Sequence, residues 1–363
     1  MIKVGITHGD INGIGYEVIL KTFADAGMTE LCVPVIYGST KVAAYHRKAL
    51  ELPPVAFNLI QNAADASFNK VNIINCVPDD IKVDLGKSAK AAGDSSLAAL
   101  ERATADLKEG LIDVLVTAPI NKDNIQQDGF QFPGHTEYLE NKFAGQGQKS
   151  LMILAKDDLR IALVTGHLPF AQVPSNITKE KIVDTISVFE ESLKRDFRIG
   201  KPRIAVLSLN PHAGENGLLG TEENDIIKPA LDEASAKGTL CFGPYAADGF
   251  FGSGYYKKFD GIIAMYHDQG LAPFKTLAME DGVNFTAGLP IIRTSPAHGT
   301  AYNIAGKNEA SEVSFRYAIY MAIDTYNNRK DYEKAYANPL RKLYHEKGGD
   351  NEVLDLTKED NED

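Results

Sequence analysis

Three histidines follow apolar segments that have the pattern of β-strands. The segment "RIALVTGH" ends at His167, "RIAVLSLNPH" at His212 and "DGIIAMYH" at His267. The carboxyl ends of parallel strands meet at one edge of a sheet, where ligands bind, so we expect the three imidazoles to converge. Three neutral imidazoles can hold a divalent metal and leave positions open for a substrate. Spacings of 45 and 55 residues are no local metal motif, so three separate, hydrogen-bonded structural histidines are the alternative.

A second group of polar residues suits the binding of an anion. The candidates are His135, Thr136, Lys275, Asn284 and Arg293. Helix N-termini and cationic side chains bind phosphate and carboxylate groups. Each residue alone suits a surface position, but together they predict a small anionic substrate held beside a metal.

The first loop, "GDINGIG", contains Gly9, Gly13 and Gly15 between a strand and a helix. This spacing differs from the dinucleotide fingerprint G-x-G-x-x-G, so it does not predict a Rossmann site. The loop is either a tight strand-to-helix turn or a surface that faces the substrate. Asp10 in this loop and Lys122 in "VTAPINK" are further candidate site residues.

The elements that must position these groups form an α/β pattern. Apolar segments alternate with helical patterns, which is typical of a mostly parallel sheet covered by helices on both faces. We expect Thr178 and Thr221 to cap two of the helices. The expected strands are "KVGI", "VPVIY", "VNIIN", "DVLVTAP", "LMILA", "RIALVTGH", "RIAVLSLNPH" and "DGIIAMYH".

Composition narrows the class of protein. The chain has 363 residues, enough for two domains that share a cleft. It begins without a signal-peptide pattern and contains no apolar run long enough to span a membrane, so we expect a cytoplasmic protein with no membrane partner. The net charge is −11, but residues 346–363 hold eight acidic residues and two lysines and supply more than half of it. We expect this tail to be disordered, and the absence of a basic stripe argues against nucleic acid as a partner.

Several longer segments together resemble one enzyme family. The chain is similar, in order from about residue 3 to 325, to the 4-hydroxythreonine-4-phosphate dehydrogenases of pyridoxal 5′-phosphate biosynthesis. The segments that carry the resemblance are "GITHGDINGIGYE", "VTAPINK", "FPGHTE", "LSLNPHAGE", "AMYHDQGLAPFK" and "TAGLPIIRTSPAHGTAYNIAGK".

The resemblance implies a two-domain fold like that of isocitrate and isopropylmalate dehydrogenases. We expect residues 1–125 plus 296–345 to form the first α/β domain, and residues 126–295 to form the second, which carries most metal and substrate ligands. The active site would lie in the cleft between the domains of a homodimer and include residues of the partner subunit.

The resemblance also assigns roles to the candidate residues. It implies that His167, His212 and His267 bind one divalent ion (Zn, Mg or Co) per site. It implies that the substrate is bound by His135, Thr136, Lys275, Asn284 and Arg293. The segment "HGTAYNIAGK" is similar to a loop that holds the adenosine part of NAD in isopropylmalate dehydrogenases, with NADP as an alternative cofactor. Its candidate cofactor residues are His298, Gly299, Thr300 and Asn303.

The implied reaction is the NAD- and metal-dependent oxidation of 4-phosphooxy-L-threonine. Its product, 2-amino-3-oxo-4-phosphooxybutanoate, would lose carbon dioxide to give 3-amino-2-oxopropyl phosphate. A base must accept the alcohol proton, and the candidates are Lys275, Asp248 and Asp268. A lysine beside a dication favours its neutral amine, so Lys275 is our hypothesis, although a carboxylate could serve equally.

Other functions fit parts of the pattern. The substrate could be a related four-carbon acid, threonate or erythronate 4-phosphate. A three-histidine site could also serve a metal hydrolase, and the fold could serve a noncatalytic binding protein.

Four positions depart from the family's usual residues. These are Ile11 and Tyr16 in the first loop, Gly249 after Asp248, and Ala297 before His298. The missing carboxylate at Ala297 bears on the choice of cofactor and substrate.

Overall fold

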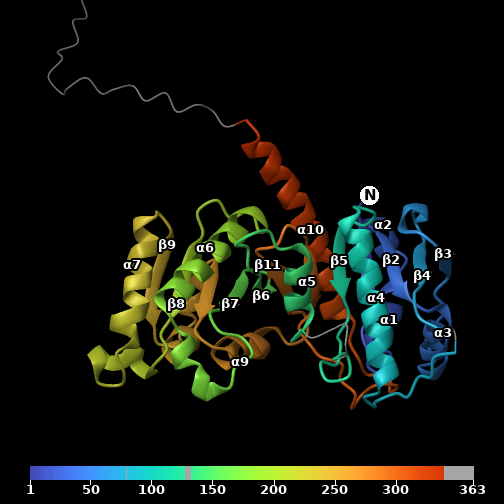
Figure 1. Ribbon diagram of the computed structural model, residues 1–363, viewed down its shortest axis with the longest axis horizontal. Helices are drawn as coiled ribbons and strands as arrows, with labels where there is room; N and C mark the ends of the chain where they lie inside the picture. Colours follow the sequence, from blue (N-terminus) through green and yellow to red (C-terminus); the bar gives the residue numbers. More distant parts are fainter. Residues whose placement is uncertain (79, 127–131, 339–363) are drawn as a thin grey trace, which may run out of the picture.

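One mixed sheet runs through the whole molecule. The computed structural model describes residues 1–78, 80–126 and 132–338. In these residues twelve strands pair in the order β3-β4-β2-β1-β5-β12-β11-β6-β7-β10-β8-β9 (Figure 1). The strands are β1 Lys3–Thr7, β2 Val33–Gly38, β3 Phe57–Ile60, β4 Val71–Asn75, β5 Val114–Thr117, β6 Leu151–Lys156, β7 Leu159–Leu163, β8 Arg203–Leu207, β9 Leu240–Tyr245, β10 Gly261–Ala264, β11 Val283–Ala287 and β12 Arg293–Pro296.

Helices cover both faces of this sheet. They are α1 Gly15–Phe23, α2 Met28–Leu31, α3 Thr40–Ala49, α4 Lys90–Lys108, α5 His135–Phe143, α6 Lys179–Arg195, α7 Lys228–Ala236, α8 Ala247–Gly252, α9 His267–Ala278 and α10 Val313–Tyr336. None of the helices in the described ranges is both long and apolar enough to cross a bilayer.

The predicted α/β class and all eight predicted strands are confirmed, as β1, β2, β4, β5, β6, β7, β8 and β10. Four strands were not predicted: β3, β9, β11 and β12. Of these, β11 ("VNFTA") and β12 ("RTSP") are rich in polar residues and so lack the apolar pattern of the others. The antiparallel pairs, β6–β7, β6–β11 and β11–β12, lie at the centre of an otherwise parallel sheet.

We call β3, β4, β2, β1, β5 and β12 the first half of the sheet, and the remaining strands the second half. The halves meet where β12 pairs with β11. The predicted domain boundaries stay a prediction, and the predicted disordered tail, 346–363, lies outside the described residues.

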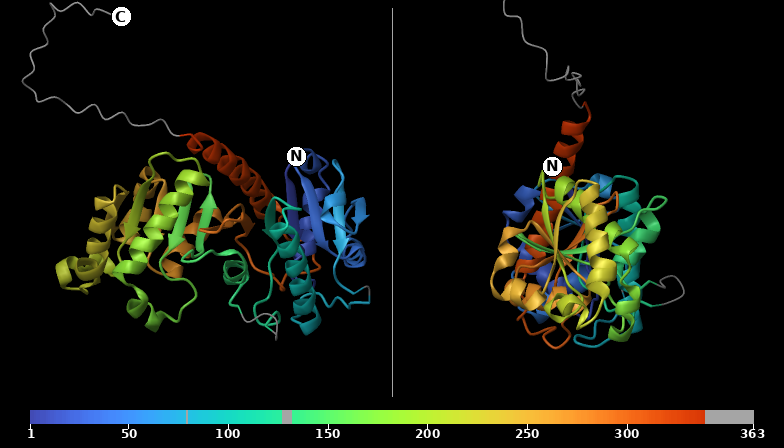
Figure 2. Two further views of the ribbon diagram at one scale, coloured as in Figure 1. Left: turned by 45° about the horizontal axis from the view of Figure 1, so that its top comes forward. Right: turned by 90° about the vertical axis from the view of Figure 1, so that its left-hand side faces the viewer.

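The two faces of the sheet are packed differently. On the face covered by α1, α6 and α10, one apolar core continues through both halves. On the opposite face the core is divided, with one cluster under α4 and α5 and another under α9. Figure 2 shows α10, in red, lying across the junction of the halves. The halves are therefore joined by packing on one face and separated on the other.

Candidate active site

The three predicted histidines follow three neighbouring parallel strands. Strand β10 lies between β7 and β8, and the chain reaches His167 after β7, His267 after β10 and His212 after β8. Because these strands are parallel, their carboxyl ends lie at one edge of the sheet. The expected common edge is therefore present.

Two of the imidazoles lie side by side. The ring centroids of His167 and His267 are 5.2 Å apart. Burial lowers the pKa of His167, and the charges of Lys122 and His267 lower it further. The nitrogen Nζ of Lys122 lies 3.5 Å from Nε2 of His167, so this ring nitrogen presents a lone pair. His167 is therefore in the neutral form that binds metals.

His267 is oriented by a carboxylate. Its Nδ1 lies 2.7 Å from Oδ1 of Asp268, whose side chain is 86% exposed. A carboxylate on one ring nitrogen fixes the tautomer and leaves the other nitrogen, Nε2, to act as a ligand. The donor chemistry of His167 and His267 thus fits a divalent metal.

His212 lines a different cavity from His167. It begins a left-handed segment, residues 212–217, with a φ of 51°. It faces a separate cavity of about 580 Å³ together with Asp248 and Tyr266. Across the described ranges no three His, Cys, Asp or Glu side chains are spaced to hold one ion. The three-histidine ligand set therefore stays a prediction.

The loop before His212 is held by a buried glutamate. Oε1 of Glu223 accepts hydrogen bonds from the backbone nitrogens of Leu209 (2.8 Å) and Asn210 (2.7 Å). Its Oε2 accepts from Nδ2 of Asn210 at 3.0 Å. Thr221 lies directly before the following helix, as predicted, and its carbonyl accepts from the backbone nitrogens of Asn224 and Asp225 at 2.9 Å. A capping bond from its hydroxyl stays a prediction. Glu223 fixes the loop that carries His212.

A second cavity, of about 440 Å³, brings together most of the predicted anion-binding residues. Its wall includes Lys122, His135, Thr136, Asn284 and Arg293. His167 lines it as well, which joins this cavity to the histidine pair. We call it the anion cavity.

Arg293, the first residue of β12, is a buried cation in the wall of the anion cavity. Its residue is 3% exposed, and burial lowers the pKa of its guanidinium to about 10. Nη2 donates to Oγ1 of Thr117 at 2.6 Å, and Nη1 donates to Oγ1 of Thr286 at 3.3 Å. Within the described part of the chain no carboxylate forms an ion pair with it. The charge of Glu137 acts on it from a distance. A buried guanidinium that is bonded to no carboxylate favours the entry of an anion.

His135 and Asn284 offer further hydrogen-bonding capacity in the same wall. Burial and the nearby charges of Arg293 and Lys122 hold the pKa of His135 well below its usual value. Its Nδ1 lies 3.2 Å from Nη2 of Arg293, which can only donate, so the proton of neutral His135 resides on Nε2. That Nε2 and the Oδ1 of Asn284 are buried without a partner. Both are available to a bound molecule.

One cation of this wall was missed. Lys181, in the first turn of α6, also lines the anion cavity. As predicted, Thr178 caps this helix, because its Oγ1 accepts from the backbone nitrogen of Lys181 at 3.2 Å. Glu137 is the one acidic residue among the described residues of the wall. The local charge is therefore positive, and no sequence motif around Lys181 indicated its place there.

Other predicted residues lie outside the anion cavity. Lys275 is exposed on α9. The pKa of His298 is lowered mainly by the burial of its imidazole and further by the charge of Lys275. Nδ1 of His298 lies 3.1 Å from the carbonyl of Gly299, while its Nε2 is buried without a partner. Asn303 is exposed, and the carbonyl of Thr300 accepts from the backbone nitrogen of Ile14.

The first loop proves to be a structural junction. Oδ2 of Asp10 accepts from Nδ2 of Asn124 at 2.7 Å and from the hydroxyl of Tyr302 at 2.8 Å. Its Oδ1 accepts from the backbone nitrogen of Asn12 at 2.8 Å. A Cβ on Gly13 would lie 2.8 Å from the carbonyl of Thr300, so glycine permits this close packing. The loop binds to residues 300–302, which favours the tight structural turn over a surface that faces the substrate.

Three of the four departures from the family pattern serve packing. Ile11 and Tyr16 are buried in a small apolar cluster with Val42. Ala297 packs against the core under α9, and its backbone nitrogen donates to Oγ of Ser314. Gly249, in the first turn of α8, has open space where a Cβ would lie, so the structure does not explain it.

The chain is similar to proteins of one family over most of its length. A family model described as pyridoxal phosphate biosynthetic protein PdxA matches residues 30–322. The 4-hydroxythreonine-4-phosphate dehydrogenase of Bacteroides thetaiotaomicron is 61% identical over 355 residues, which cover 98% of this chain and 97% of the relative. That of a Sulfurihydrogenibium species is 42% identical over 89% of this chain and 98% of the relative.

Solved structures are similar too. The 4-hydroxythreonine-4-phosphate dehydrogenase of Klebsiella pneumoniae gives a TM-score of 0.78 at 35% identity, covering 90% of this chain and 98% of that chain. A terephthalate 1,2-cis-dihydrodiol dehydrogenase of Burkholderia xenovorans gives 0.58 at 25% identity, covering 89% and 98%.

Proposed function

Because the chain belongs to the family of pyridoxal phosphate biosynthetic protein PdxA, we propose that it oxidises 4-phosphooxy-L-threonine with NAD and a divalent metal. The product would be 2-amino-3-oxo-4-phosphooxybutanoate, which decarboxylates to 3-amino-2-oxopropyl phosphate. The observation that carries the proposal is Arg293, a buried guanidinium without a carboxylate partner, in the wall of a cavity beside two histidines.

The anion cavity suits one end of a small phosphorylated acid. Arg293 would supply charge to the phosphate or the carboxylate of the substrate, and Nε2 of His135 would donate a hydrogen bond to it. Oδ1 of Asn284 would accept from a donor group such as the amino group. Lys122 and Lys181 raise the positive potential at the wall. These contacts would hold the reacting carbon in one orientation.

The metal would be held by His167 and His267, with His212 as the third ligand, and would be Zn, Mg or Co. When bound, it would act as a Lewis acid that favours loss of the proton from the substrate hydroxyl. The contact between Asp268 and Nδ1 of His267 supports this role, because it leaves Nε2 of His267 for the ion. NAD, or NADP, would accept the hydride.

We propose that Lys275 is the base that accepts the proton of the substrate hydroxyl, with Asp248 and Asp268 as the alternative bases. Asp268 already bonds to His267, and Asp248 faces the cavity that holds His212. Lys275 lies two turns beyond His267 on α9, and in the described structure its ammonium forms no hydrogen bond or ion pair. Its ammonium lies near His298, the first residue of the proposed cofactor segment, so it would stand between metal and cofactor.

The unpartnered Nε2 of His298 supports a cofactor role for "HGTAYNIAGK", with Gly299, Thr300 and Asn303. A homodimer whose interface completes the site is supported by exposed apolar side chains on the His212 side. Phe170, which is 74% exposed, lines the cavity that contains His212, and Leu218, which is 77% exposed, directly follows the left-handed segment that begins at His212. Dilution below the dimer dissociation constant should then abolish activity.

The proposal is tested by NADH formation with metal-free protein, before and after adding zinc, magnesium or cobalt. The substrates to compare are 4-phosphooxy-L-threonine, erythronate 4-phosphate and threonate 4-phosphate. Metal-dependent NADH with the threonine phosphate is the expected result. Activity with a rival acid alone would change the substrate and keep the chemistry, and no NADH with any of them would overturn the proposal.

A further inference from the structure

Helix α10 is fixed by an arginine near each end. Near its start, Nη1 of Arg316 donates to Oδ2 of Asp25 at 3.0 Å, and Nη2 donates to the carbonyl of Lys21. Near its end, Arg329 contacts Asp196, the residue that follows α6. Since Lys21 lies in α1 of the first half and Asp196 in the second half, α10 ties the halves together.

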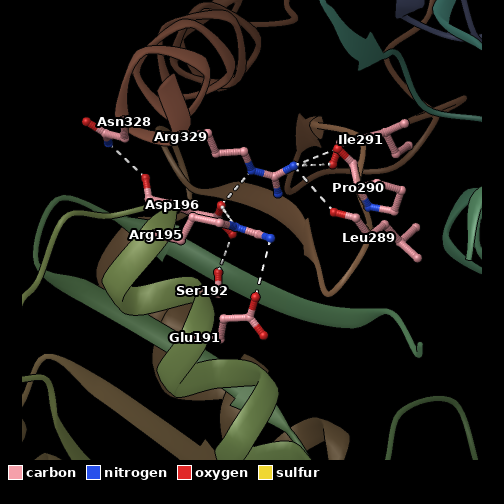
Figure 3. A network of polar contacts seen from close by, with 9 residues as sticks. All are labelled: Glu191, Ser192, Arg195, Asp196, Leu289, Pro290, Ile291, Asn328 and Arg329. Carbon is pink, nitrogen blue, oxygen red and sulfur yellow. Dashed lines mark hydrogen bonds and ion pairs between the residues drawn. The ribbon is translucent and has the colours of Figure 1, made fainter. Parts of the chain in front are cut away.

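The contacts of Arg329 form a buried network (Figure 3). Its Nε donates to Oδ1 of Asp196 at 2.7 Å. Its Nη1 donates to the carbonyls of Leu289 (3.3 Å), Pro290 (3.0 Å) and Ile291 (3.0 Å). Arg329 is 7% exposed, its contacts with Asp196 and Leu289 are buried, and those with Pro290 and Ile291 are partly buried.

Asp196 is held in turn by its own helix. Its Oδ2 accepts from Oγ of Ser192 at 2.8 Å, and its Oδ1 accepts from Nε of Arg195 at 3.0 Å. The backbone carbonyl of Asp196 accepts from Nδ2 of Asn328, the residue before Arg329, at 2.8 Å. The carboxylate that receives Arg329 therefore has one fixed position relative to α6.

The three carbonyls belong to the connection between β11 and β12. Asn284 lies on β11 and Arg293 begins β12, so both strands joined by this connection carry residues of the anion cavity. The next carbonyl, that of Ile292, accepts from the backbone nitrogen of Leu115 on β5. Every carbonyl from residue 289 to 292 thus has a fixed donor, and Arg293 follows directly.

We propose that Arg329 and Asp196 are a positioning pair for the active site. They set where Arg293 and Asn284 lie by holding the carbonyls of residues 289–291, and they do so from the helix that joins the halves. The inference rests on the proposed function of the anion cavity. Buried ion pairs add little stability compared with apolar residues of the same size, so a role in specifying position suits this pair.

Arg316 provides a matched control. It lies on the same helix, it forms ion pairs with Asp25 and Glu312, and it also binds a backbone carbonyl. Its partners lie in α1, in the segment that follows it and at the start of α10, away from the β11–β12 connection. Replacing it loosens α10 without releasing the carbonyls before Arg293.

The experiment compares Arg329→Gln, Arg329→Lys and Arg316→Gln with the wild type. Lysine keeps the charge beside Asp196, but one ammonium cannot reach the carboxylate and three carbonyls, so Arg329→Lys serves if the glutamine variant fails to fold. The two readouts are KM and kcat for 4-phosphooxy-L-threonine, and the Kd of inorganic phosphate by titration calorimetry, which needs no turnover.

Both Arg329 variants should raise KM and the phosphate Kd by about tenfold, with kcat changed by less than about threefold, because displaced binding groups are costly. Arg316→Gln should change none of them by more than about twofold. Phosphate binding that stays at the wild-type value in the Arg329 variants, or an equal effect of Arg316→Gln, would overturn the positioning role. Wild-type protein that binds phosphate but forms no NADH would overturn the proposed function alone. Wild-type protein that does neither would overturn both.

Discussion

The first loop and the anion cavity both bury polar side chains, and they differ in how many hydrogen-bond partners those side chains find within the chain. Asp10 in the loop accepts from Asn12, Asn124 and Tyr302, so both of its oxygens are occupied. In the cavity, Nε2 of His135 and Oδ1 of Asn284 have no partner. Unpaired buried polar groups are costly and therefore rare. Unpaired nitrogens also occur on His8, directly before the loop, so the contrast rests on Asp10 alone. The carboxylate of Asp10 is satisfied within the chain, whereas the unpaired groups of the cavity line a space that a ligand can enter.

Two arginines near β12, Arg293 and Arg329, differ in their charged partners and not in this way, since Nη2 of Arg329 is itself buried without a hydrogen-bond partner. Arg329 has a carboxylate partner and three carbonyls. Arg293, four residues after Leu289, has hydroxyl and imidazole partners and no carboxylate in the described structure. The guanidinium of Arg329 is bonded to a carboxylate of the chain, whereas that of Arg293 is not and can bind an external anion.

The largest effect is expected at the proposed base. Lys275→Met should lower kcat by about a thousandfold, the range in which general bases contribute. Because this exposed side chain has no structural partner in the described ranges, the free energy of unfolding and the metal content should stay the same. Steady-state kinetics with metal analysis checks this. Retained turnover would move the role to Asp248 or Asp268.

The second largest effect on activity is expected at Arg293, the buried cation of the anion cavity. Arg293→Met should lower kcat/KM for 4-phosphooxy-L-threonine by about a hundredfold, since a desolvated charge pair with the substrate is lost. The free energy of unfolding should fall by no more than about 1 kcal/mol, because removal of a buried charge offsets the lost hydrogen bonds. Steady-state kinetics measures kcat/KM, and urea denaturation measures the free energy of unfolding. A large loss of stability with little change in kcat/KM would show that Arg293 stabilises the fold and does not bind the substrate.

The opposite pattern is expected in the first loop. Asp10→Ala leaves the donors of Asn12, Asn124 and Tyr302 unsatisfied, so it should cost about 3 kcal/mol in the free energy of unfolding. The folded fraction should keep a phosphate Kd within about twofold of the wild type, because Asp10 does not line the anion cavity. Urea denaturation and calorimetry test this. Normal stability would show that the loop network is dispensable.

A smaller, pH-dependent effect is expected beneath that loop. His8, Tyr16 and His46 stack with ring centroids 5.1 Å apart, and burial lowers the pKa of both histidines to about 4. The unfolded chain, with histidine pKa values near 6.5, binds more protons between these values. The free energy of unfolding is therefore highest above pH 6.5 and falls as pH drops toward 4, by about 1 kcal/mol per histidine from pH 7 to 5.5.

His46→Gln sharpens this test. The imidazole Nε2 of His46 lies 2.7 Å from the carbonyl of Ile11, and a glutamine amide can donate to the same oxygen. The variant should lose part of the stability difference between pH 7 and 5.5, as measured by urea denaturation at each pH. An unchanged difference would mean that other groups cause the acid sensitivity.

The sequence predicted the parts of the site that follow apolar strands. His167 and His267 lie together because "RIALVTGH" and "DGIIAMYH" form adjacent parallel strands, as expected. The position of His212 could not be predicted in the same way. Its strand, β8, is adjacent too, but the chain then enters a left-handed segment held by Glu223, and a strand pattern does not encode such a loop.

The residues that the sequence could not place depend on contacts between distant segments. Arg293 and Asn284 were predicted as anion ligands, yet their strands were not, because polar strands at the centre of a sheet lack an apolar pattern. Lys181 reaches the cavity only because α6 packs beside it. Asp196 and Arg329 lie 133 residues apart and meet only when α10 crosses the halves.

The most direct test of the central claim, that the unpartnered groups around Arg293 receive an anionic substrate, is titration calorimetry with 4-phosphooxy-L-threonine. Wild-type protein and Arg293→Met would be titrated side by side. The account predicts that the wild type binds and that the variant binds about a hundredfold more weakly. Equal affinities would contradict it and would place the anion elsewhere.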